Sequence, residues 1–388
     1  PAGGPHELVV SGANTLRVTD ILVGEVWLCS GQSNMEMGLG VVANGAEEVA
    51  AADFPRIRLF ELPQTAAGEP ARDVAAEWRI CRPDTVGAGN WGGFSAVAYF
   101  FGRELHRELD VPIGLIDASW GGTLIEPWTP PGGFAAVPAV AALAAEAERL
   151  DREYKERTLP ASLAEIEAWV AASRAALAAG ERLPDTPRWP QHPLAYPHTP
   201  TGLYNGMIHP LAPLAIRGAL WYQGEANVHT DDGLLYTEKM KALIGGWRAV
   251  WGQGDFPFYY VQLAPFKYTL HNPAIRTDQM PLIWQAQLNA LAIPNTGMAV
   301  TTDVGDWRDI HPADKLTVGR RLALWALTRT YGRDDVVCSG PLYLSLAIED
   351  GKVRVTFDHV GGGLMARDGQ PLNWFEVAAA DGEFVAAR

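Results

Sequence analysis

Short apolar runs alternate with longer helix-forming segments along most of this chain. The runs are rich in β-branched and aromatic residues and end in polar or glycine-rich turns, a pattern typical of buried strands in a parallel sheet. They occur at 21–29, 56–60, 111–118, 219–222, 257–263 and 297–302. Segments typical of helices lie at 96–109, 236–251, 279–291 and 315–331. The alternation predicts an α/β fold with a doubly wound sheet.

The two ends of the chain follow a different pattern. Residues 6–20 hold two short strand-like runs around a Ser/Gly/Asn cluster, and two further runs flank Asp350 and Gly351. Small turn residues between strand-like runs predict β-hairpins. We therefore expect three parts: the end of an N-terminal β-rich domain at 1–23, a main domain at 24–335, and a C-terminal β-rich segment at 336–388.

Within the main domain, residues 132–200 interrupt the alternation. The stretches 135–157 and 161–179 are rich in the strong helix formers Ala, Glu, Arg and Leu, and Pro160 separates them. This composition predicts a helical hairpin, followed by a proline-rich connector at 183–200 that is not helical. We interpret 132–200 as an insertion in the main fold and a candidate lid.

Composition excludes several classes of protein. The chain has 388 residues, with 31 Lys and Arg against 45 Asp and Glu, a formal net charge of −14. So acidic a surface argues against nucleic acid and anionic membranes as partners. No apolar run reaches membrane-spanning length. The three cysteines are far apart and form no CxxC pair, so neither a zinc site nor a redox motif is supported.

Polar loops follow the predicted strands, and they carry the candidate chemistry. They lie at 30–34, 119–123, 223–227 and 303–311. In a doubly wound sheet, ligands bind beyond the carboxyl ends of the strands, so loops far apart in sequence can converge there.

A serine and a histidine in these loops suit nucleophilic catalysis. Ser33 follows the turn at Gly31 and stands where free backbone N–H groups could hold an oxyanion, although it could also be only a helix cap. Of the nine histidines, only His311 lies at a predicted strand end beside acidic residues. Asp309 and Asp306 are its candidate orienting carboxylates. The alternative for His311 is a structural residue at a helix entry.

Two other classes of function compete with this interpretation. A glycoside hydrolase would pair Glu225 with a second carboxylate such as Asp303 or Asp306. A non-catalytic carbohydrate-binding protein would tolerate loss of both Ser33 and His311. The high count of fourteen tryptophans fits sugar stacking as well as a large core.

Several sequence blocks, in order, resemble one family. They are GEVWLCSGQSNMEM, SWGGTLIEPW, LYNGMIHPLAP with GALWYQGEAN, and DVGDWRDIHPADK. The chain resembles the sialate O-acetylesterase-like branch of the SGNH hydrolases, which includes plant and bacterial carbohydrate acetylesterases. The resemblance implies a flavodoxin-like three-layer α/β/α sandwich with a parallel sheet, the helical and proline-rich insertion, and flanking β-sandwich pieces at both ends.

The resemblance also implies roles for particular residues. Ser33 would be the nucleophile and His311 the base, with the N–H groups of Ser33 and Gly122 in the oxyanion hole. An asparagine completes that hole in the superfamily; here Gln223 would take its place, with Asn227 as the alternative. The superfamily aspartate stands three residues before the histidine, where this chain has Arg308, so Asp309, two residues before, is assigned as the orienter. Glu225 would hold the loops together.

The function implied is that of a carboxylic ester hydrolase that removes O-acetyl groups from carbohydrates by two-step acyl transfer. Its substrates would be acetylated sialic acids, or acetylated xylan and xyloglucan fragments, and it would need no metal or organic cofactor. We expect a bacterial protein, periplasmic or secreted, whose signal segment lies outside this chain. The sequence leaves the oligomeric state open.

Overall fold

The computed structural model describes residues 2–373, 375–379 and 382–387. Its contacts divide the chain into two compact units, Pro1–Val336 and Val337–Arg388, which are described separately. No helix among the described residues is both long and apolar enough to cross a membrane.

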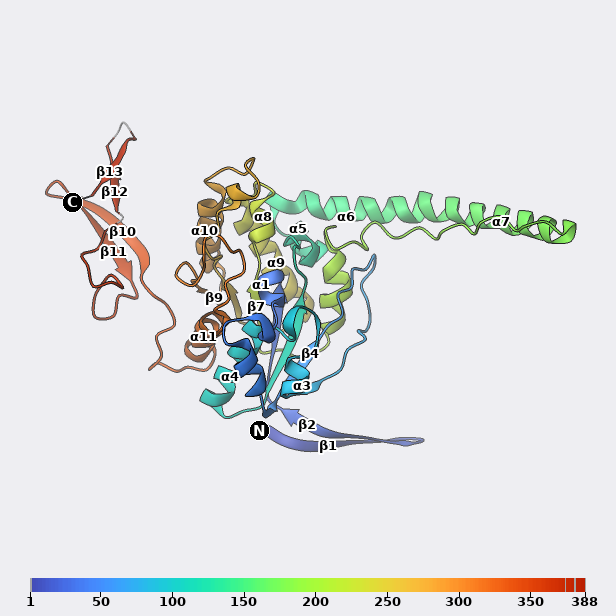
Figure 1. Ribbon diagram of the computed structural model, residues 1–388, viewed down its shortest axis with the longest axis horizontal. Coiled ribbons are helices and arrows are strands. Elements are labelled where there is room, and N and C mark those ends of the chain that lie inside the picture. The colour runs from blue at the N-terminus through green and yellow to red at the C-terminus, as the bar shows by residue number, and fades with distance from the viewer. Residues whose placement is uncertain (1, 374, 380–381, 388) are drawn as a thin grey trace. The chain divides into compact units, whose positions relative to one another are not determined.

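A seven-stranded sheet forms the centre of the first unit (Figure 1). Its order is β5-β4-β6-β3-β7-β8-β9, and all neighbours are parallel except the β4–β5 pair. The strands are β3 (Glu25–Gly31), β4 (Phe54–Glu61), β5 (Arg79–Cys81), β6 (Ile113–Ser119), β7 (Gly218–Tyr222), β8 (Phe258–Val261) and β9 (Thr296–Ala299).

Strand β3 lies at the middle of this sheet because its residues are apolar on both faces. Trp27, Leu28 and Cys29 are fully buried. The chain passes from β3 to β4 and β6 on one side, then crosses to β7, β8 and β9 on the other. Such a reversal of strand order opens a crevice at the carboxyl ends of the central strands. The apolar run 21–29 predicts that residues 21–23 belong to this strand, but in the structure they end a separate strand, Thr15–Val23, of a hairpin.

Helices cover both faces of the sheet. They are α1 (Ser33–Glu36), α2 (Gly45–Ala50), α3 (Pro83–Val86), α4 (Ala96–Leu109), α5 (Pro131–Ala135), α6 (Ala141–Glu153), α7 (Leu159–Ala179), α8 (Glu225–Val228), α9 (Leu235–Trp251), α10 (Gln279–Asn289) and α11 (Lys315–Trp325). On one face, Trp27 packs edge-on against Phe101 of α4, with ring centroids 4.9 Å apart. On the other, Trp221 of β7 meets Trp247 of α9 at 5.9 Å. The expected α/β fold is confirmed.

Shorter turns complete the helical structure. The 3₁₀ turns are Leu39–Val41, Asn90–Gly92, Glu126–Trp128, Pro138–Val140, His209–Leu211, Tyr268–Leu270 and Ala290–Ala292. The π turns are Tyr154–Thr158, Tyr204–Ile208 and Ala326–Thr330.

The hairpins expected at both ends of the chain are confirmed. In the first unit, β1 (Gly3–Ser11) pairs with β2 (Thr15–Val23). In the second unit, β10 (Leu342–Glu349) pairs with β11 (Lys352–Asp358) as expected. A further hairpin, which the sequence pattern does not predict, pairs β12 (Glu376–Ala378) with β13 (Phe384–Ala386). Asp350 and Gly351 both have positive φ, at 50° and 73°, as the tight turn between two paired strands requires.

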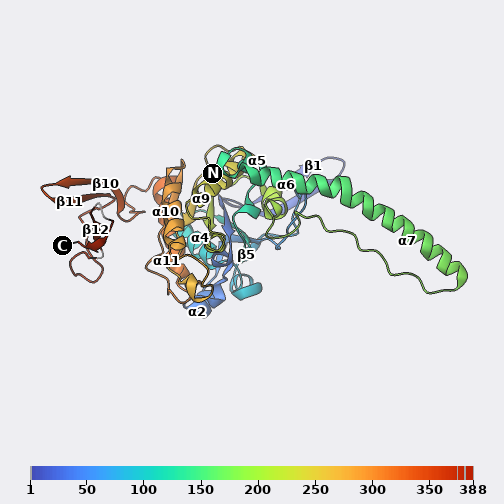
Figure 2. The ribbon, with the colours of Figure 1, turned by 90° about the horizontal axis from the view of Figure 1, so that it is seen from above.

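The insertion contradicts the predicted helical hairpin. Instead, α6 and α7 continue into one another through the π turn Tyr154–Thr158 (Figures 1 and 2). Pro160 stands in the first turn of α7, where its missing N–H costs little. The wider bonding of the π turn, in which the N–H of Leu159 donates to the carbonyl of Tyr154, carries the helix past the proline.

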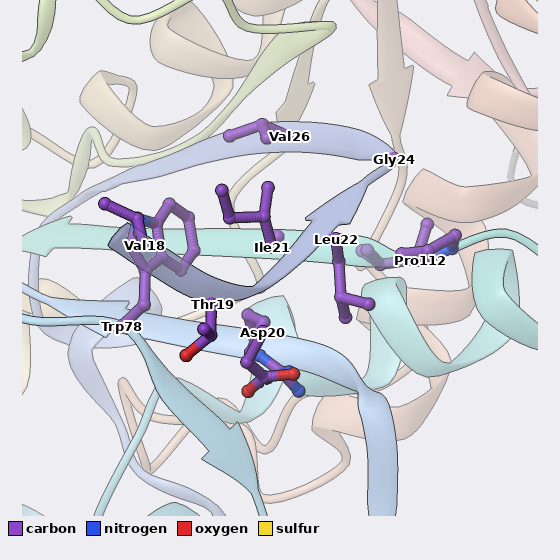
Figure 3. A pocket seen from close by; sticks show the side chains of 12 residues that line it. Val18, Thr19, Asp20, Ile21, Leu22, Gly24, Val26, Trp78 and Pro112 are labelled. Atoms are coloured by element: carbon purple, nitrogen blue, oxygen red, sulfur yellow. Dashed lines mark hydrogen bonds and ion pairs between the residues drawn. The ribbon is translucent and has the colours of Figure 1, made fainter. Parts of the chain in front are cut away.

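A hollow of about 400 Å³ lies at the amino ends of the central strands (Figure 3). Its lining residues include Ile21 and Leu22 of the β1–β2 hairpin, Trp78 and Pro112. Arg58 and Asp20 also line it and form an ion pair of 2.8 Å. It contains neither Ser33 nor His311. It is therefore not the site that the sequence predicts at the carboxyl ends.

Candidate active site

Ser33 is the first residue of the short helix that follows β3. The turn before it requires glycine: Gly31 has φ +145°, and a side chain there would meet the Tyr222 carbonyl oxygen at 2.1 Å. The N–H of Gln32 donates to that same carbonyl at 3.0 Å. The chain therefore turns sharply at the sheet edge and presents Ser33 at the carboxyl end of the central strand.

His311 meets Ser33 across 278 residues of sequence. Its Nε2 lies 2.9 Å from the Ser33 Oγ, a hydrogen-bond distance. The imidazole is half-buried, and the ring of Trp91 lies nearly perpendicular to it with ring centroids 5.0 Å apart. The two predicted catalytic side chains are thus brought together in the geometry that a nucleophile and its base need.

The acidic residues near His311 hold its loop rather than its ring. Asp309 Oδ1 accepts a hydrogen bond of 2.9 Å from the backbone N–H of His311, and lies 4.0 Å from the ring Nδ1. Asp306 Oδ1 accepts from the backbone N–H of Arg308 at 2.9 Å. Of the two, only Asp309 places its charge beside the imidazole, and it does so without a direct hydrogen bond to Nδ1 in this conformation.

The environment of His311 favours the neutral imidazole that a general base must provide. Burial lowers the pKa of His311, and the positive charge of Lys315 lowers it further, while Asp309 partly opposes both. Lys315 is itself fully buried, and burial lowers its pKa to about 7. Opposite charges on Glu225, Asp309 and Asp314 limit that shift.

Asn34, next to Ser33, joins two buried charges to the histidine loop. Its Nδ2 donates to Glu225 Oε1 at 2.5 Å and to the carbonyl of Ile310 at 2.9 Å, while its Oδ1 accepts from Lys315 Nζ. Burial raises the pKa of Glu225. The other carboxylate oxygen of Glu225 is buried and has no hydrogen-bond partner among the described residues. Glu225 therefore lies behind the nucleophile and not in position to attack or protonate a substrate.

A glycine loop after β6 forms the other side of the site. The Gly121 N–H donates to Glu36 Oε2, and a side chain at Gly121 would come within 3.3 Å of the Ser33 Cβ. Gly122 has φ +73° and open space on its side-chain side. Within the described residues, the N–H groups of Ser33 and Gly122 have no protein acceptor. Both donors are therefore available to a ligand.

Gln223 and Asn227 lie beneath this loop with their amide donors already engaged. Gln223 Nε2 lies 2.7 Å from Asn227 Oδ1 and 3.1 Å from both Gln32 Oε1 and the Thr123 carbonyl. Asn227 Nδ2 donates to Glu126 and Asp232, at 3.1 and 2.6 Å. In this conformation neither amide has an N–H free for an oxyanion. The two side chains instead fix the loops that carry Gln32, Thr123 and Ile125.

A buried ion cluster anchors that network from below. Lys239 Nζ contacts Glu126 Oε1 at 2.5 Å and Asp232 Oδ2 at 2.6 Å, and all three side chains are nearly inaccessible to solvent. Breaking a buried ion pair costs free energy, because it leaves a buried charge without its partner. The cluster therefore gives the glycine loop a rigid support. No group of three or more His, Cys, Asp or Glu among the described residues could hold a metal ion.

Two hollows are lined by residues close in sequence to the paired side chains, although neither Ser33 nor His311 lines them. One, of about 380 Å³, has aromatic walls that include Phe266, Trp284 and Trp307, and Lys267 also lines it. The other, of about 430 Å³, is acidic and includes Glu36, Glu61 and Asp117. Burial raises the pKa of Asp117 to about 8 and also raises that of Glu61. Near the site there is thus an aromatic hollow and a mainly acidic one, which Arg79 also lines.

Sequence reasoning missed Asn34, Lys315 and Trp91 as parts of the site. Asn34 belongs to the same polar turn as Ser33, and Lys315 follows His311 by four residues, at the start of α11. Their closeness in sequence to Ser33 and His311 therefore indicated that they could belong to the site. Their partners, 191 and 281 residues away, could not be read from the chain.

Comparisons with known proteins agree with this arrangement. The family model for sialic acid-specific acetylesterases, a carbohydrate esterase family, matches residues 23–152 and 188–327. Sialate O-acetylesterase of Rattus norvegicus is 34% identical over 387 residues, covering 92% of this chain and 67% of that protein. The Homo sapiens protein is 31% identical over 381 residues, covering 92% and 64%.

A crystal structure with a similar fold is that of a carbohydrate acetylesterase from Xanthomonas citri. It has a TM-score of 0.76 and 33% identity, and the match covers 99% of this chain and 74% of that one. Fold and comparisons together define a carboxylic ester hydrolase of the carbohydrate esterase class. The chain belongs to the sialic acid-specific acetylesterase family.

Proposed function

We propose that this protein is a serine esterase that removes O-acetyl groups from carbohydrates, with Ser33 as nucleophile and His311 as general base. The observation that carries the proposal is the 2.9 Å approach of His311 Nε2 to Ser33 Oγ at the carboxyl edge of the sheet. A hydroxyl is a weak nucleophile until an adjacent base accepts its proton. The lowered pKa of His311 keeps that base neutral near pH 7.

The reaction proceeds by two acyl transfers. His311 Nε2 takes the proton from Ser33 Oγ as the oxygen attacks the acetyl carbonyl carbon. The N–H groups of Ser33 and Gly122 hold the oxyanion. The bond to the sugar oxygen then breaks, and His311 returns its proton to the departing alcohol. Water, activated in turn by His311, attacks the acetyl-serine and releases acetate.

Asp309 positions His311 through the loop and stabilises the imidazolium by its charge. The hydrogen bond from the His311 backbone N–H and the 4.0 Å separation from Nδ1 support this role. A carboxylate that acts through charge alone contributes less than one bonded directly to the ring.

The substrate of this proposal is an O-acetylated sialic acid or related acidic sugar. Aromatic walls beside the His311 loop can stack against a sugar ring. The guanidinium of Arg308 lies 4.4 Å above Trp307, and Lys267 has no carboxylate partner among the described residues, so both cations could meet a sugar carboxylate. The curated relatives are named for the same substrate class.

Neutral sugars form the second candidate, as acetylated xylan or xyloglucan fragments. The hollow lined by Glu36 favours them, because a carboxylate there repels an anionic sugar. A glycosidase is disfavoured because Glu225 is fully buried behind Asn34.

The test compares O-acetyl sialic acid, acetylated xylo-oligosaccharides and a chain-length series of p-nitrophenyl esters. We expect acetate release from the sugars, with rates on the p-nitrophenyl esters falling from acetate to octanoate. Faster hydrolysis of the octanoate would overturn the carbohydrate assignment. A higher kcat/KM on xylo-oligosaccharides than on the sialate would favour the second candidate.

A further inference from the structure

Helix α7 has few neighbours within its own chain. None of its residues is buried, and it extends the helix begun by α6 away from the sheet (Figures 1 and 2). A helix exposed on all sides is normally polar all round. Yet α7 is mostly Ala, Leu, Ile, Val and Trp, and its only charged residues are Glu165, Glu167 and Arg174. This helix keeps an apolar surface that the chain does not cover.

The segment that contains α7 is an addition to the hydrolase fold. The family model matches the chain up to 152 and again from 188, leaving out 153–187, here called the arm. None of the candidate catalytic residues lies in the arm. A segment that the fold does not need, and that keeps apolar side chains in water, is typical of an interaction surface.

One side of α7 is already partly occupied by the chain that returns from its tip. Trp169 Nε1 donates to the carbonyl of Pro184 in that segment at 3.0 Å. Ile166 and Ser173, on the same side of the helix, are half-buried. A partner must therefore use another side.

A stripe of five residues remains along the neighbouring side of the helix. Its members are four, three, four and three residues apart, which places them on one face of an α-helix. They are Leu163, Glu167, Val170, Arg174 and Leu177, here called the arm stripe. Leu163 is 50% exposed and Leu177 73%, Glu167 and Arg174 are exposed as well, and Val170 at the centre is half-buried. Glu167 and Arg174 form no ion pair within the part of the chain that the structure describes.

The arm stripe is self-complementary when reversed. Two copies laid antiparallel about Val170 bring Leu163 of each against Leu177 of the other, and Glu167 of each against Arg174 of the other. A two-fold interface requires this property, because the same surface serves both subunits. A parallel pairing would instead oppose Glu167 to Glu167 and Arg174 to Arg174. The small side chains of Ala171 and Ala178 beside the stripe let two helices approach closely.

We propose that the arm is a dimerisation element, in which the arm stripe pairs antiparallel with that of a second copy of this chain. The two-fold axis passes near Val170. The apolar ends and centre of the stripe become buried, and two Glu167–Arg174 ion pairs form across the interface. The charges fix the antiparallel direction, since opposed like charges disfavour the other.

The experiment is sedimentation velocity on the full chain, from about 1 to about 100 µM protein. Glu167→Arg and Arg174→Glu each oppose like charges at two places in the dimer, so each should weaken association by about tenfold or more. The double variant Glu167→Arg with Arg174→Glu restores opposite charges and should recover association. Glu165→Arg makes the same charge change on a different side of α7 and serves as the matched control. Hydrolysis of p-nitrophenyl acetate should be equal in all variants, which shows that each is folded.

Dimers in the wild type and in Glu165→Arg, weakened in both single variants and recovered in the double variant, would establish the arm as the interface. Wild-type protein that remains monomeric throughout the concentration range would overturn the proposal. So would a dimer that neither single charge reversal weakens, because its interface would lie elsewhere.

Discussion

Replacing Asn34 by alanine tests whether the buried network behind Ser33 sets the geometry of the site. Asn34 is fully buried and bonds to two charged side chains, Glu225 and Lys315, and to the carbonyl of Ile310. The carbonyl belongs to the residue just before His311. Asn34→Ala therefore leaves two buried charges without their bridge and frees the backbone next to the candidate base.

The expected loss can be worked out from these bonds. A hydrogen bond to a charged group contributes about 1.5–3 kcal/mol and a neutral one about 1 kcal/mol, which sums to roughly 4–7 kcal/mol. Glu225 and Lys315 carry opposite charges and can move toward one another in the space that opens, so we expect a net loss of about 2–4 kcal/mol in the free energy of unfolding. We also expect kcat to fall by about tenfold or more, since small misplacements at a site are costly.

The assay combines urea denaturation of wild type and variant with p-nitrophenyl acetate kinetics. Asn227→Ala is the matched control, because it removes a buried asparagine that bonds to Glu126 and Asp232 instead of to the histidine loop. It should lose comparable stability and less kcat. A loss below about 1 kcal/mol in Asn34→Ala, with unchanged kcat, would refute the reasoning, because neither charge would then depend on Asn34.

Three further predictions concern the catalytic assignments. Ser33→Ala and His311→Ala should each lower the rate of hydrolysis by about the same large factor, because the two residues act as a unit. A fluorophosphonate label that mass spectrometry finds on a serine other than Ser33 would contradict the assignment. Asp309→Asn should lower kcat/KM more than Asp306→Asn, since only Asp309 lies beside the ring; the reverse order, measured with p-nitrophenyl acetate, would make Asp306 the orienter. Lys315→Met removes a positive charge that lowers the pKa of His311, so the pKa of His311 should rise. The acid limb of the pH profile of kcat/KM should therefore move to higher pH. A limb that does not move, or that moves to lower pH, would show that Lys315 does not act on His311.

The sequence by itself determined the class of fold and the positions of the candidate chemistry. Apolar runs marked the strands because a parallel strand is buried on both faces, as Trp27 and Leu28 are. Each strand end then marked a place on one edge of the sheet, which is why Ser33 and His311 could be paired although 278 residues separate them. Gly31 was informative because a turn this tight excludes any side chain.

Tertiary structure alone decided which polar groups face the site and which support it. The resemblance assigns Gln223 to the oxyanion hole, with Asn227 as the alternative, but in the structure their amides donate to Gln32, Thr123, Glu126 and Asp232. The continuous helix through Pro160 depended on a π turn that composition does not indicate. Periodicity reports which face of an element is buried, whereas hydrogen-bond partners depend on the distances between elements, which only the folded chain defines.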